Sequence, residues 1–195
     1  MISKSNKLGP LQDSQTVIII GGGPAGSSCA ISLKTLGRRL GKDINVILYE
    51  GRKFDPDCIK RVGVLAPPLV QTLEETLGVP FPCQAIERKI VGYYLHSGDA
   101  KIRLYMGGNL SYVTHNIAID TYLLEKAREM GVTVLPGRVE EINFYSSKVV
   151  VKSEVGGTEG DVLVGAFGLD ATTAASLEKV TPYRRPKPLY SIITK

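Results

Sequence analysis

The chain has 195 residues, of which 43% are hydrophobic and 22% charged, and its net charge is +5; this composition is typical of a globular domain. No apolar run approaches the roughly 20 residues that a membrane-spanning helix needs. The basic residues form short clusters near Arg38, Lys60 and Arg184 without interleaved aromatic residues, which favours solvated surface charge over nucleic-acid binding. An anionic ligand such as a dinucleotide would also suit a basic protein.

The first fifteen residues are polar and lack the apolar segment of a secretory signal, so we expect a disordered arm over residues 1–15. The three cysteines are Cys29, Cys58 and Cys83. Their number is odd and their spacing fits no metal site, which argues against a disulfide framework and for a reducing compartment. We therefore expect a cytoplasmic protein without a bound metal.

The next segment predicts a strand, a helix and a second strand. Residues 17–20 are apolar and β-branched, as in a strand buried on both faces. Helical spacing follows over residues 25–36, where Ala30, Leu33 and Leu36 share one side. Residues 44–50 form a second apolar run, which ends in Glu50. Together they predict a βαβ unit with two parallel strands.

A glycine-rich corner joins the first strand to the helix. Gly21, Gly23 and Gly26 form the pattern G-x-G-x-x-G, in which the first glycine permits a tight turn, the second lets a pyrophosphate approach the backbone, and the third lets the helix pack closely. Pro24 fits the first helical turn, and Glu50 is placed to accept hydrogen bonds from ribose hydroxyls. The segment therefore predicts a dinucleotide site, against the alternative of a purely structural turn.

The spacing to the acid is longer than usual. Gly21 and Glu50 are 29 positions apart, whereas the fingerprint usually has about 20. The surplus falls in "LGRRLGKD", which we expect to be an extended helix end or a loop. These additional residues need not change the position of Glu50 relative to the glycine corner.

The middle of the chain changes character twice. Leu69, Leu73 and Leu77 show helical spacing with Gly78 as a stop. Residues 79–116 then carry short β-like runs, "KIVGYYLH", "KIRLYM" and "LSYVTH", separated by the turns "SGDA" and "GGN", which predicts part of an antiparallel sheet. The segment "IDTYLLEKAREMG" predicts a helix, with Asp120 as a simple N-cap and Gly131 as the stop.

The remaining segments "VTVLPG", "RVEEINFY", "KVVVKSEV" and "GDVLVGAFG" predict four strands, with "GGTEG" as the connection between the last two. We expect a three-stranded antiparallel meander that returns to an apolar strand. A nicotinamide-binding Rossmann domain would instead continue to alternate strands and helices.

These motifs resemble the FAD-dependent oxidoreductases of the p-hydroxybenzoate hydroxylase superfamily, and within it the geranylgeranyl reductase-like branch. The matching stretches are "VIIIGGGPAGSSCAISL", "VILYE", "IDTYLLEKAREMGVTVLPGRVEEI" and "DVLVGAFGLDA". The resemblance implies an α/β fold with a Rossmann-like FAD-binding βαβ unit, the meander and part of a β-rich substrate domain. It divides the chain into an FAD-binding part over 16–78, a substrate-domain-like β insertion over 79–117, a second FAD-binding part over 118–180 and the start of a catalytic domain over 181–195.

The resemblance also implies cofactor-binding residues, which belong to four places in the chain. The glycine loop contributes Gly21, Gly22, Gly23, Pro24, Ala25 and Gly26, and the end of the second strand contributes Glu50, Gly51 and Arg52. Val139 is expected beside the adenine. The late motif, expected near the ribityl–pyrophosphate region, contributes Gly165, Gly168 and Asp170.

Three features depart from the family pattern. Phe167 stands where the family's late motif has an aspartate, and Asp170 is the candidate to restore that polar contact. Asn116 stands where the family has an arginine. The third FAD motif, of G-D-A-A/G-G type, has no counterpart here, because Gly160 and Asp161 run directly into a strand. We therefore expect an N-terminal portion of a longer flavoprotein that retains FAD weakly by itself.

No catalytic residue can be assigned from the sequence. Cys58, in a stretch similar to the geranylgeranyl reductase loop, is either a redox thiol or a small semi-buried residue, and Lys60 and Arg61 face either the flavin or solvent. His96 and His115 are expected to be structural, whereas Tyr93 and Tyr94 could face substrate or core.

The function implied by the resemblance is hydride or electron transfer through flavin N5, with NAD(P)H usually the external reductant and a small organic or polyprenyl-like molecule as substrate. Membrane association is expected only for a lipid substrate. The alternatives left open are an NAD(P)-binding Rossmann domain and a non-catalytic dinucleotide-binding module.

Overall fold

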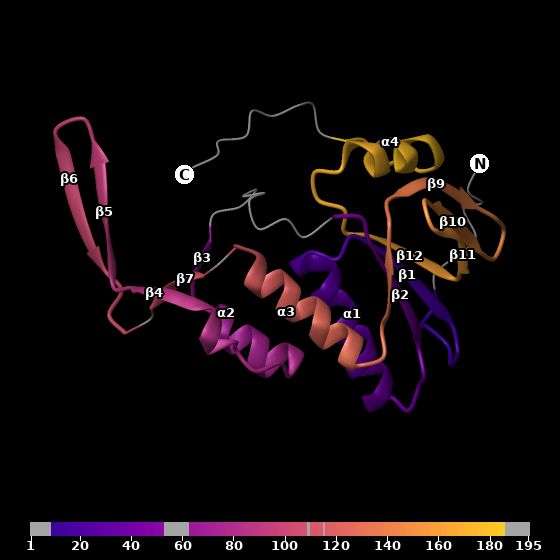
Figure 1. Ribbon diagram of the computed structural model, residues 1–195, viewed down its shortest axis with the longest axis horizontal. Helices are drawn as coiled ribbons and strands as arrows, with labels where there is room; N and C mark the ends of the chain where they lie inside the picture. Colours follow the sequence, from indigo (N-terminus) through magenta and orange to yellow (C-terminus); the bar gives the residue numbers. More distant parts are fainter. Residues whose placement is uncertain (1–8, 53–62, 109, 115, 186–195) are drawn as a thin grey trace.

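The computed structural model describes residues 9–52, 63–108, 110–114 and 116–185 (Figure 1). Its centre is a parallel sheet with the strand order β12-β1-β2-β8. The bounds are β1 (Thr16–Ile20), β2 (Asn45–Glu50), β8 (Thr133–Pro136) and β12 (Val162–Gly165). Both predicted strands of the βαβ unit are present, and they pair in parallel as expected.

Two apolar layers enclose this sheet, because side chains of β1 alternate between its faces. Val17 and Ile19 point into one layer, and Ile18 and Ile20 point into the other. All four side chains are almost completely buried, which explains why the sequence of β1 is uniformly apolar instead of alternating with polar residues.

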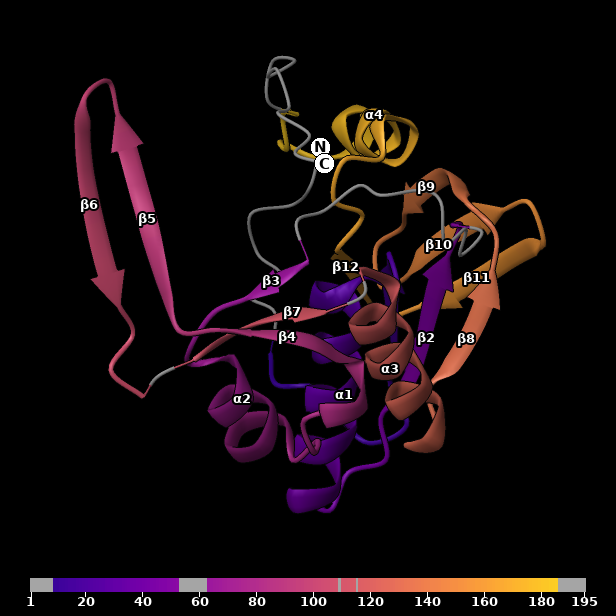
Figure 2. The same cartoon turned by 60° about the vertical axis from the view of Figure 1, so that its left-hand side comes forward.

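Helices α1 (Pro24–Arg39) and α3 (Asn116–Glu129) cover the first face side by side (Figure 2). Ala30 and Ile31 of α1 and Leu123 and Leu124 of α3 belong to that layer. Helix α1 continues to Arg39, so part of the surplus between Gly21 and Glu50 is helix end, as predicted.

The second face is covered by an antiparallel meander and a short helix. The bounds are β9 (Val139–Phe144), β10 (Val149–Ser153), β11 (Gly156–Gly160) and α4 (Ala171–Val180). The expected meander exists, but its assignment is corrected. The segment "GGTEG" is the strand β11 and not a connection, because it pairs with β10 from Gly156 to Gly160. The segment "VTVLPG" contributes β8 to the parallel sheet instead.

The antiparallel strands predicted between residues 79 and 116 are also present. A helix formed by α2 (Leu69–Gln71) and the π-helical η1 (Thr72–Leu77) ends at Gly78, as expected. The strands that follow form a three-stranded sheet, β3-β7-β4, and a separate β5-β6 hairpin that projects from the body in both views (Figures 1 and 2). Their bounds are β3 (Val64–Leu65), η2 (Cys83–Ala85), β4 (Ile86–Ile90), β5 (Gly92–Ser97), β6 (Ala100–Tyr105) and β7 (Ser111–Thr114).

Part of the segment predicted to be a disordered arm is ordered. Leu11 packs against the first apolar layer, the Ser14 amide donates to the Asp43 carbonyl at 2.8 Å, and the Asn45 amide donates to the Gln15 carbonyl at 2.9 Å. Residues 11–15 are therefore attached to the turn before β2, and residues 1–8 lie outside the described chain. None of the described helices combines the length and the apolar character needed to cross a lipid bilayer.

Candidate dinucleotide-binding site

The carboxyl ends of β1, β2 and β12 meet at one edge of the parallel sheet. Ile20 pairs with Tyr49 on one side and with Gly165 on the other. The Gly21 amide donates to the Tyr49 carbonyl at 2.8 Å, and the Ala166 amide donates to the Ile20 carbonyl at 2.8 Å. The glycine corner, Glu50 and the start of the late motif are thus brought together, and ligands of such sheets bind outside this edge.

Each glycine of the corner has a distinct steric reason to be glycine. Gly21 has a φ of +108°, and a Cβ there would lie 2.3 Å from the Ala166 carbonyl oxygen. A Cβ on Gly26 would lie 1.8 Å from the Gly21 carbonyl oxygen. Gly23 differs, because the nearest atom to its Cβ position is Nη2 of Arg52 at 3.6 Å. As predicted, Gly21 permits the turn, Gly26 permits close packing of the helix, and Gly23 leaves its backbone open.

The amino end of α1 is arranged to receive an anion. Pro24 is the first helical residue, and within the described chain no side chain caps this end and no acidic residue occupies its first turn. The first amide groups of a helix have no partner inside it and carry the positive end of its dipole. Ser27 holds the loop from behind, because its buried hydroxyl donates to the Gly22 carbonyl at 3.0 Å. A negative group fits in front of Gly23.

Glu50 lies directly beneath the corner. It is 7% exposed, and a Cβ on Gly22 would lie 2.7 Å from its Oε2. Arg52 encloses this carboxylate: its amide and Nε donate to Oε1 at 2.7 and 3.0 Å, and its Nη2 donates to Oε2 at 2.7 Å. Glu50 is therefore placed where the sequence predicted, but it is paired with a guanidinium.

The N-cap assignment of Asp120 is wrong. Helix α3 begins at Asn116, so Asp120 lies in its second turn. It is 2% exposed, and its Oδ2 lies 3.3 Å from Nη1 of Arg52. A signal was available, because Asp120 shares helical spacing with Leu123, Leu124 and Ala127, which all belong to the first apolar layer. A carboxylate on such a stripe is buried and needs a partner.

The late motif borders the corner through its backbone. A Cβ on Gly165 would lie 2.8 Å from the Phe167 ring, and Gly168 has a φ of +57°. The half-buried Phe167 packs against the second apolar layer and makes an edge-to-face contact with Tyr183. Asp170 caps α4, since its Oδ1 accepts from the Thr172 amide at 3.0 Å.

Two further predicted residues adjoin the end of β2. The Val139 side chain is buried in the second apolar layer, and its carbonyl accepts from the Thr173 hydroxyl. A Cβ on Gly51 would lie 2.5 Å from Cγ of Arg138, and the Gly137 amide donates to the Glu50 carbonyl at 3.1 Å. The segment 137–139 thus runs beside Glu50, and Val139 can contact a ligand there only through its main chain.

The other candidate residues lie outside the described chain, in a hydrogen bond within the β insertion, or on the exposed surface of the hairpin. Cys58, Lys60, Arg61 and His115 lie outside the described residues. Tyr93 donates its hydroxyl to Ser111 Oγ at 2.8 Å. His96 and Tyr94 are exposed on the projecting hairpin, with ring centroids 6.5 Å apart. In the parts of the chain that the structure covers, no group of three or more His, Cys, Asp or Glu side chains could hold a metal ion.

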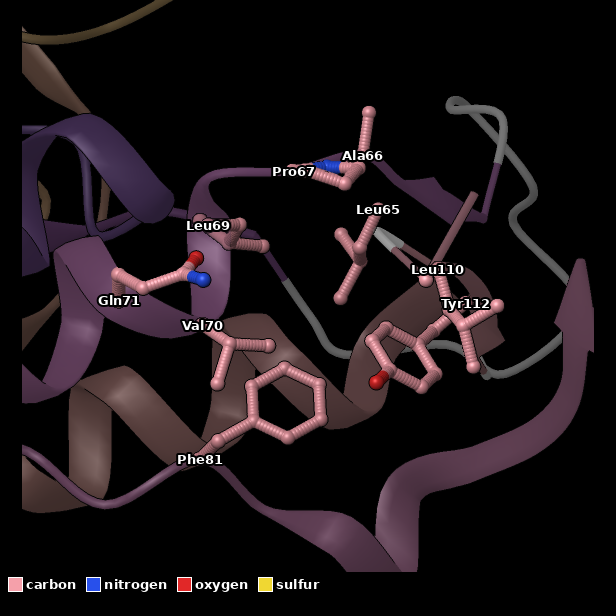
Figure 3. A pocket seen from close by; sticks show the side chains of 10 residues that line it. Leu65, Ala66, Pro67, Leu69, Val70, Gln71, Phe81, Leu110 and Tyr112 are labelled. Carbon is pink, nitrogen blue, oxygen red and sulfur yellow. The ribbon is translucent and has the colours of Figure 1, made fainter. Parts of the chain in front are cut away.

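An apolar groove lies between α2 and the β3-β7 pair, with a volume of about 130 Å³ (Figure 3). The side chains of Leu65, Val70, Phe81 and Tyr112 turn toward it. The Phe81 and Tyr112 rings pack at a centroid distance of 5.5 Å. None of the glycine-corner residues lines this groove.

Comparison with known proteins finds a flavoprotein of similar sequence. No family model matches the chain. It is 29% identical over 157 residues to the mitochondrial electron transfer flavoprotein-ubiquinone oxidoreductase of Dictyostelium discoideum, a match that covers 76% of this chain and 25% of that protein.

Solved structures give a similar picture. Halogenase PltM in complex with phloroglucinol and FAD superimposes with a TM-score of 0.66 at 18% identity, over 84% of this chain and 36% of that one. The p-nitrophenol 4-monooxygenase PnpA of Pseudomonas putida DLL-E4 superimposes with a TM-score of 0.65 at 16% identity, over 86% of this chain and 44% of that one. The chain spans less than half the length of each of these proteins. It has the α/β fold of the matched part of these flavin-dependent halogenase and monooxygenase structures, with a Rossmann-like parallel sheet joined to antiparallel sheets.

Proposed function

We propose that the chain is the dinucleotide-binding portion of an FAD-dependent oxidoreductase. The observation that carries this proposal is the open backbone at Gly23, which faces the uncapped amino end of α1 and has the Glu50 carboxylate at the end of the adjacent strand. The diphosphate would lie against the corner, and Glu50 would accept hydrogen bonds from the adenosine ribose. The fold shared with PltM, which was solved with FAD, supports FAD over a nicotinamide.

The remaining predicted residues would contact the cofactor through their backbone. Gly165 and Gly168 carry the late motif toward the corner, and Val139 would approach the adenine through its main chain. Asp170, whose two carboxylate oxygens both accept hydrogen bonds from α4, would offer its remaining acceptor positions. When bound, FAD supplies hydride or electron transfer, with NAD(P)H as the external reductant. The protein supplies binding and orientation.

We propose a small organic molecule as the substrate. The apolar groove beside Phe81 and Tyr112 supports a ligand with an apolar part, which includes the polyprenyl chain of the geranylgeranyl reductase-like branch. Two of the basic clusters have structural partners, which supports a small molecule over nucleic acid. Nη2 of Arg38 donates to the Met130 carbonyl at 2.9 Å, and Nη1 of Arg184 donates to the Tyr183 carbonyl at 2.8 Å.

Titration with cofactors tests the proposal directly. The purified chain is titrated with FAD, FMN and NAD⁺, and binding is followed by flavin fluorescence and by calorimetry. We expect FAD to bind more tightly than FMN, because FMN lacks the diphosphate and the adenosine that the corner and Glu50 would hold. Tighter binding of NAD⁺ than of FAD would replace this proposal with a nicotinamide site, and equal binding of FAD and FMN would exclude the corner as the main contact.

A further inference from the structure

The β5-β6 hairpin exposes a cluster of large apolar and aromatic side chains. Among the described strands, β5 and β6 pair only with each other, and the hairpin projects from the body in both views (Figures 1 and 2). A hairpin without a third strand or a packed layer is at best marginally stable in water, so a surface that covers it would also stabilise it. The side chains in this cluster are 45–65% exposed: Tyr94, Leu95, Ile102, Leu104 and Tyr105.

The pairing register divides the hairpin into two unlike faces. Residues that oppose each other in an antiparallel pair share a face, and successive residues of a strand alternate between the two faces. One face, which we call the apolar face, consists of the uncharged cross-strand pairs Tyr93–Leu104, Leu95–Ile102 and Ser97–Ala100. This face therefore offers leucine and isoleucine side chains without a charged group between them.

The opposite face, which we call the basic face, combines cations with aromatic rings. Its cross-strand pairs are Tyr94–Arg103, His96–Lys101 and Gly92–Tyr105. Cζ of Arg103 lies 4.4 Å from the centroid of the Tyr105 ring and 5.1 Å from that of the Tyr94 ring, so the guanidinium lies against both rings. The hairpin is therefore amphipathic, with one apolar face and one face that is cationic and aromatic.

This division matches the two layers of a membrane surface. An amphipathic segment lies in the interface with its apolar face toward the acyl chains and its cations toward anionic headgroups. Tyrosine is enriched at headgroup level, and arginine and lysine extend their charged ends toward the headgroups and water. The outer edges of β5 and β6, which no described strand pairs, must keep their amide and carbonyl groups out of the hydrocarbon. The hairpin would therefore lie along the surface.

A second copy of the chain and a nucleic acid match this hairpin less well. Two strands of six residues form a face of about 20 by 10 Å, roughly 200 Å², whereas a standard protein interface buries about 800 Å² on each partner. Binding to a bilayer requires no matched protein surface, because it scales with apolar area and electrostatic attraction. A nucleic acid would contact the basic face and leave the apolar face in water.

We propose that the β5-β6 hairpin attaches this chain to the surface of a bilayer that contains anionic lipids. Leu95, Ile102 and Leu104 face the acyl chains, and Lys101 and Arg103 contact the lipid phosphates. This inference does not depend on the proposed dinucleotide function, because no residue of the glycine corner belongs to the hairpin.

Co-sedimentation with vesicles tests the proposal on the purified chain. The vesicles contain phosphatidylcholine alone, or phosphatidylcholine and phosphatidylglycerol in equal amounts. We expect binding to the second kind, weakened when the salt is raised from about 0.1 to about 1 M, because the Debye length falls from about 10 to about 3 Å. Lys101→Gln combined with Arg103→Gln should lower the partition coefficient by about 30-fold, or about 5-fold for each charge. Arg39→Gln combined with Lys179→Gln is the matched control, because both residues are exposed on the body of the molecule.

Serine substitutions test the apolar face. Leu95→Ser combined with Ile102→Ser should lower the partition into the anionic vesicles by at least about 10-fold, because two apolar side chains no longer gain from leaving water. Leu40→Ser is the control, because Leu40 is 71% exposed directly after α1. Thermal unfolding and circular dichroism monitor the fold of each variant.

An introduced tryptophan locates the contact even if the serine variant does not fold. The chain contains no tryptophan, so Ile102→Trp places a single reporter on the apolar face and Leu40→Trp places one on the body. With anionic vesicles, the emission of Ile102→Trp should shift to shorter wavelength and should be quenched by brominated lipids. The emission of Leu40→Trp should change little.

Several results would overturn the proposal. A wild type that stays in solution with anionic vesicles, or an Ile102→Trp emission that does not respond to them, excludes the hairpin as a membrane contact. A dimeric mass in solution that the two serine substitutions abolish would assign the apolar face to a second copy. Binding that survives the serine substitutions but not the loss of both cations would reduce the contact to attraction for any polyanion.

Discussion

Replacing Gly23 by valine should abolish dinucleotide binding and leave the fold in place. The φ of Gly23 is −70° and its ψ is −175°, a conformation that valine adopts readily. Among the described residues, only Arg52 Nη2, at 3.6 Å, lies within 4 Å of the Cβ position. The new side chain would therefore project into the space that we assign to the diphosphate, and it meets little of the protein itself.

The size of the effect follows from the contacts that are lost. A displaced diphosphate forfeits at least two charge-assisted hydrogen bonds of about 1.5–3 kcal/mol each. The sum, about 3–6 kcal/mol, corresponds to a loss in affinity of at least ~100-fold. The cost to the fold is smaller, because exchanging glycine for a β-branched residue at a helix N-cap costs about 1 kcal/mol.

Flavin fluorescence quenching and calorimetry measure the affinity, and thermal unfolding measures the stability. Gly157→Val is the matched control, because Gly157 lies in β11 with only the Val151 carbonyl oxygen, at 3.8 Å, near its Cβ position. Undiminished FAD binding by Gly23→Val would refute the assignment of the corner. So would an equal loss of binding in Gly157→Val, since the effect would then be indirect.

Substitutions at three further positions probe the fold. Gly26→Ala should destabilise the protein by about 3 kcal/mol in urea unfolding, because its Cβ would lie 1.8 Å from a carbonyl oxygen; a change below 0.5 kcal/mol would contradict this close packing. Asp170→Ala removes the cap of α4 and should cost about 1 kcal/mol, whereas Asp170→Asn, which can still cap, should cost less. The hydrogen bond from the Thr16 amide, followed by the pairing with Lys148, holds the pKa of Asp161 below its usual range. Its contribution to stability is therefore complete above the unfolded pKa of about 3.9 and disappears as the pH falls through the lower folded pKa. The difference in unfolding free energy between wild type and Asp161→Asn should accordingly be larger at pH 7 than at about pH 3, and a difference that grows toward low pH would contradict the assignment.

Much of the site was predictable because its determinants are local. The order strand, glycine corner, helix and acid-terminated strand follows from hydrophobic periodicity and from the steric freedom of Gly21, Gly23 and Gly26, which depend on residues close in sequence. The parallel pairing of β1 with β2 then places Glu50 beside the corner, whatever the length of the helix end between them.

Other features depended on residues that are distant in sequence. The segment "GGTEG" has the composition of a turn, but β10 provides a full ladder of partners, and pairing overrides the low strand propensity of glycine. Asp120 has the side chain of an N-cap, but it is buried on α3 and pairs with Arg52, which is 68 positions away in the sequence. Neither relationship can be read from a local window.

The sequence by itself determined where the backbone must be bare and where a carboxylate ends a buried strand, because steric freedom and apolar periodicity are properties of neighbouring residues. Only the tertiary structure decided that Arg52 pairs with Glu50 and that Asp120 is buried and also pairs with Arg52. A salt bridge between separate elements forms only when packing brings its partners within a few ångströms and excludes the water that would otherwise solvate them.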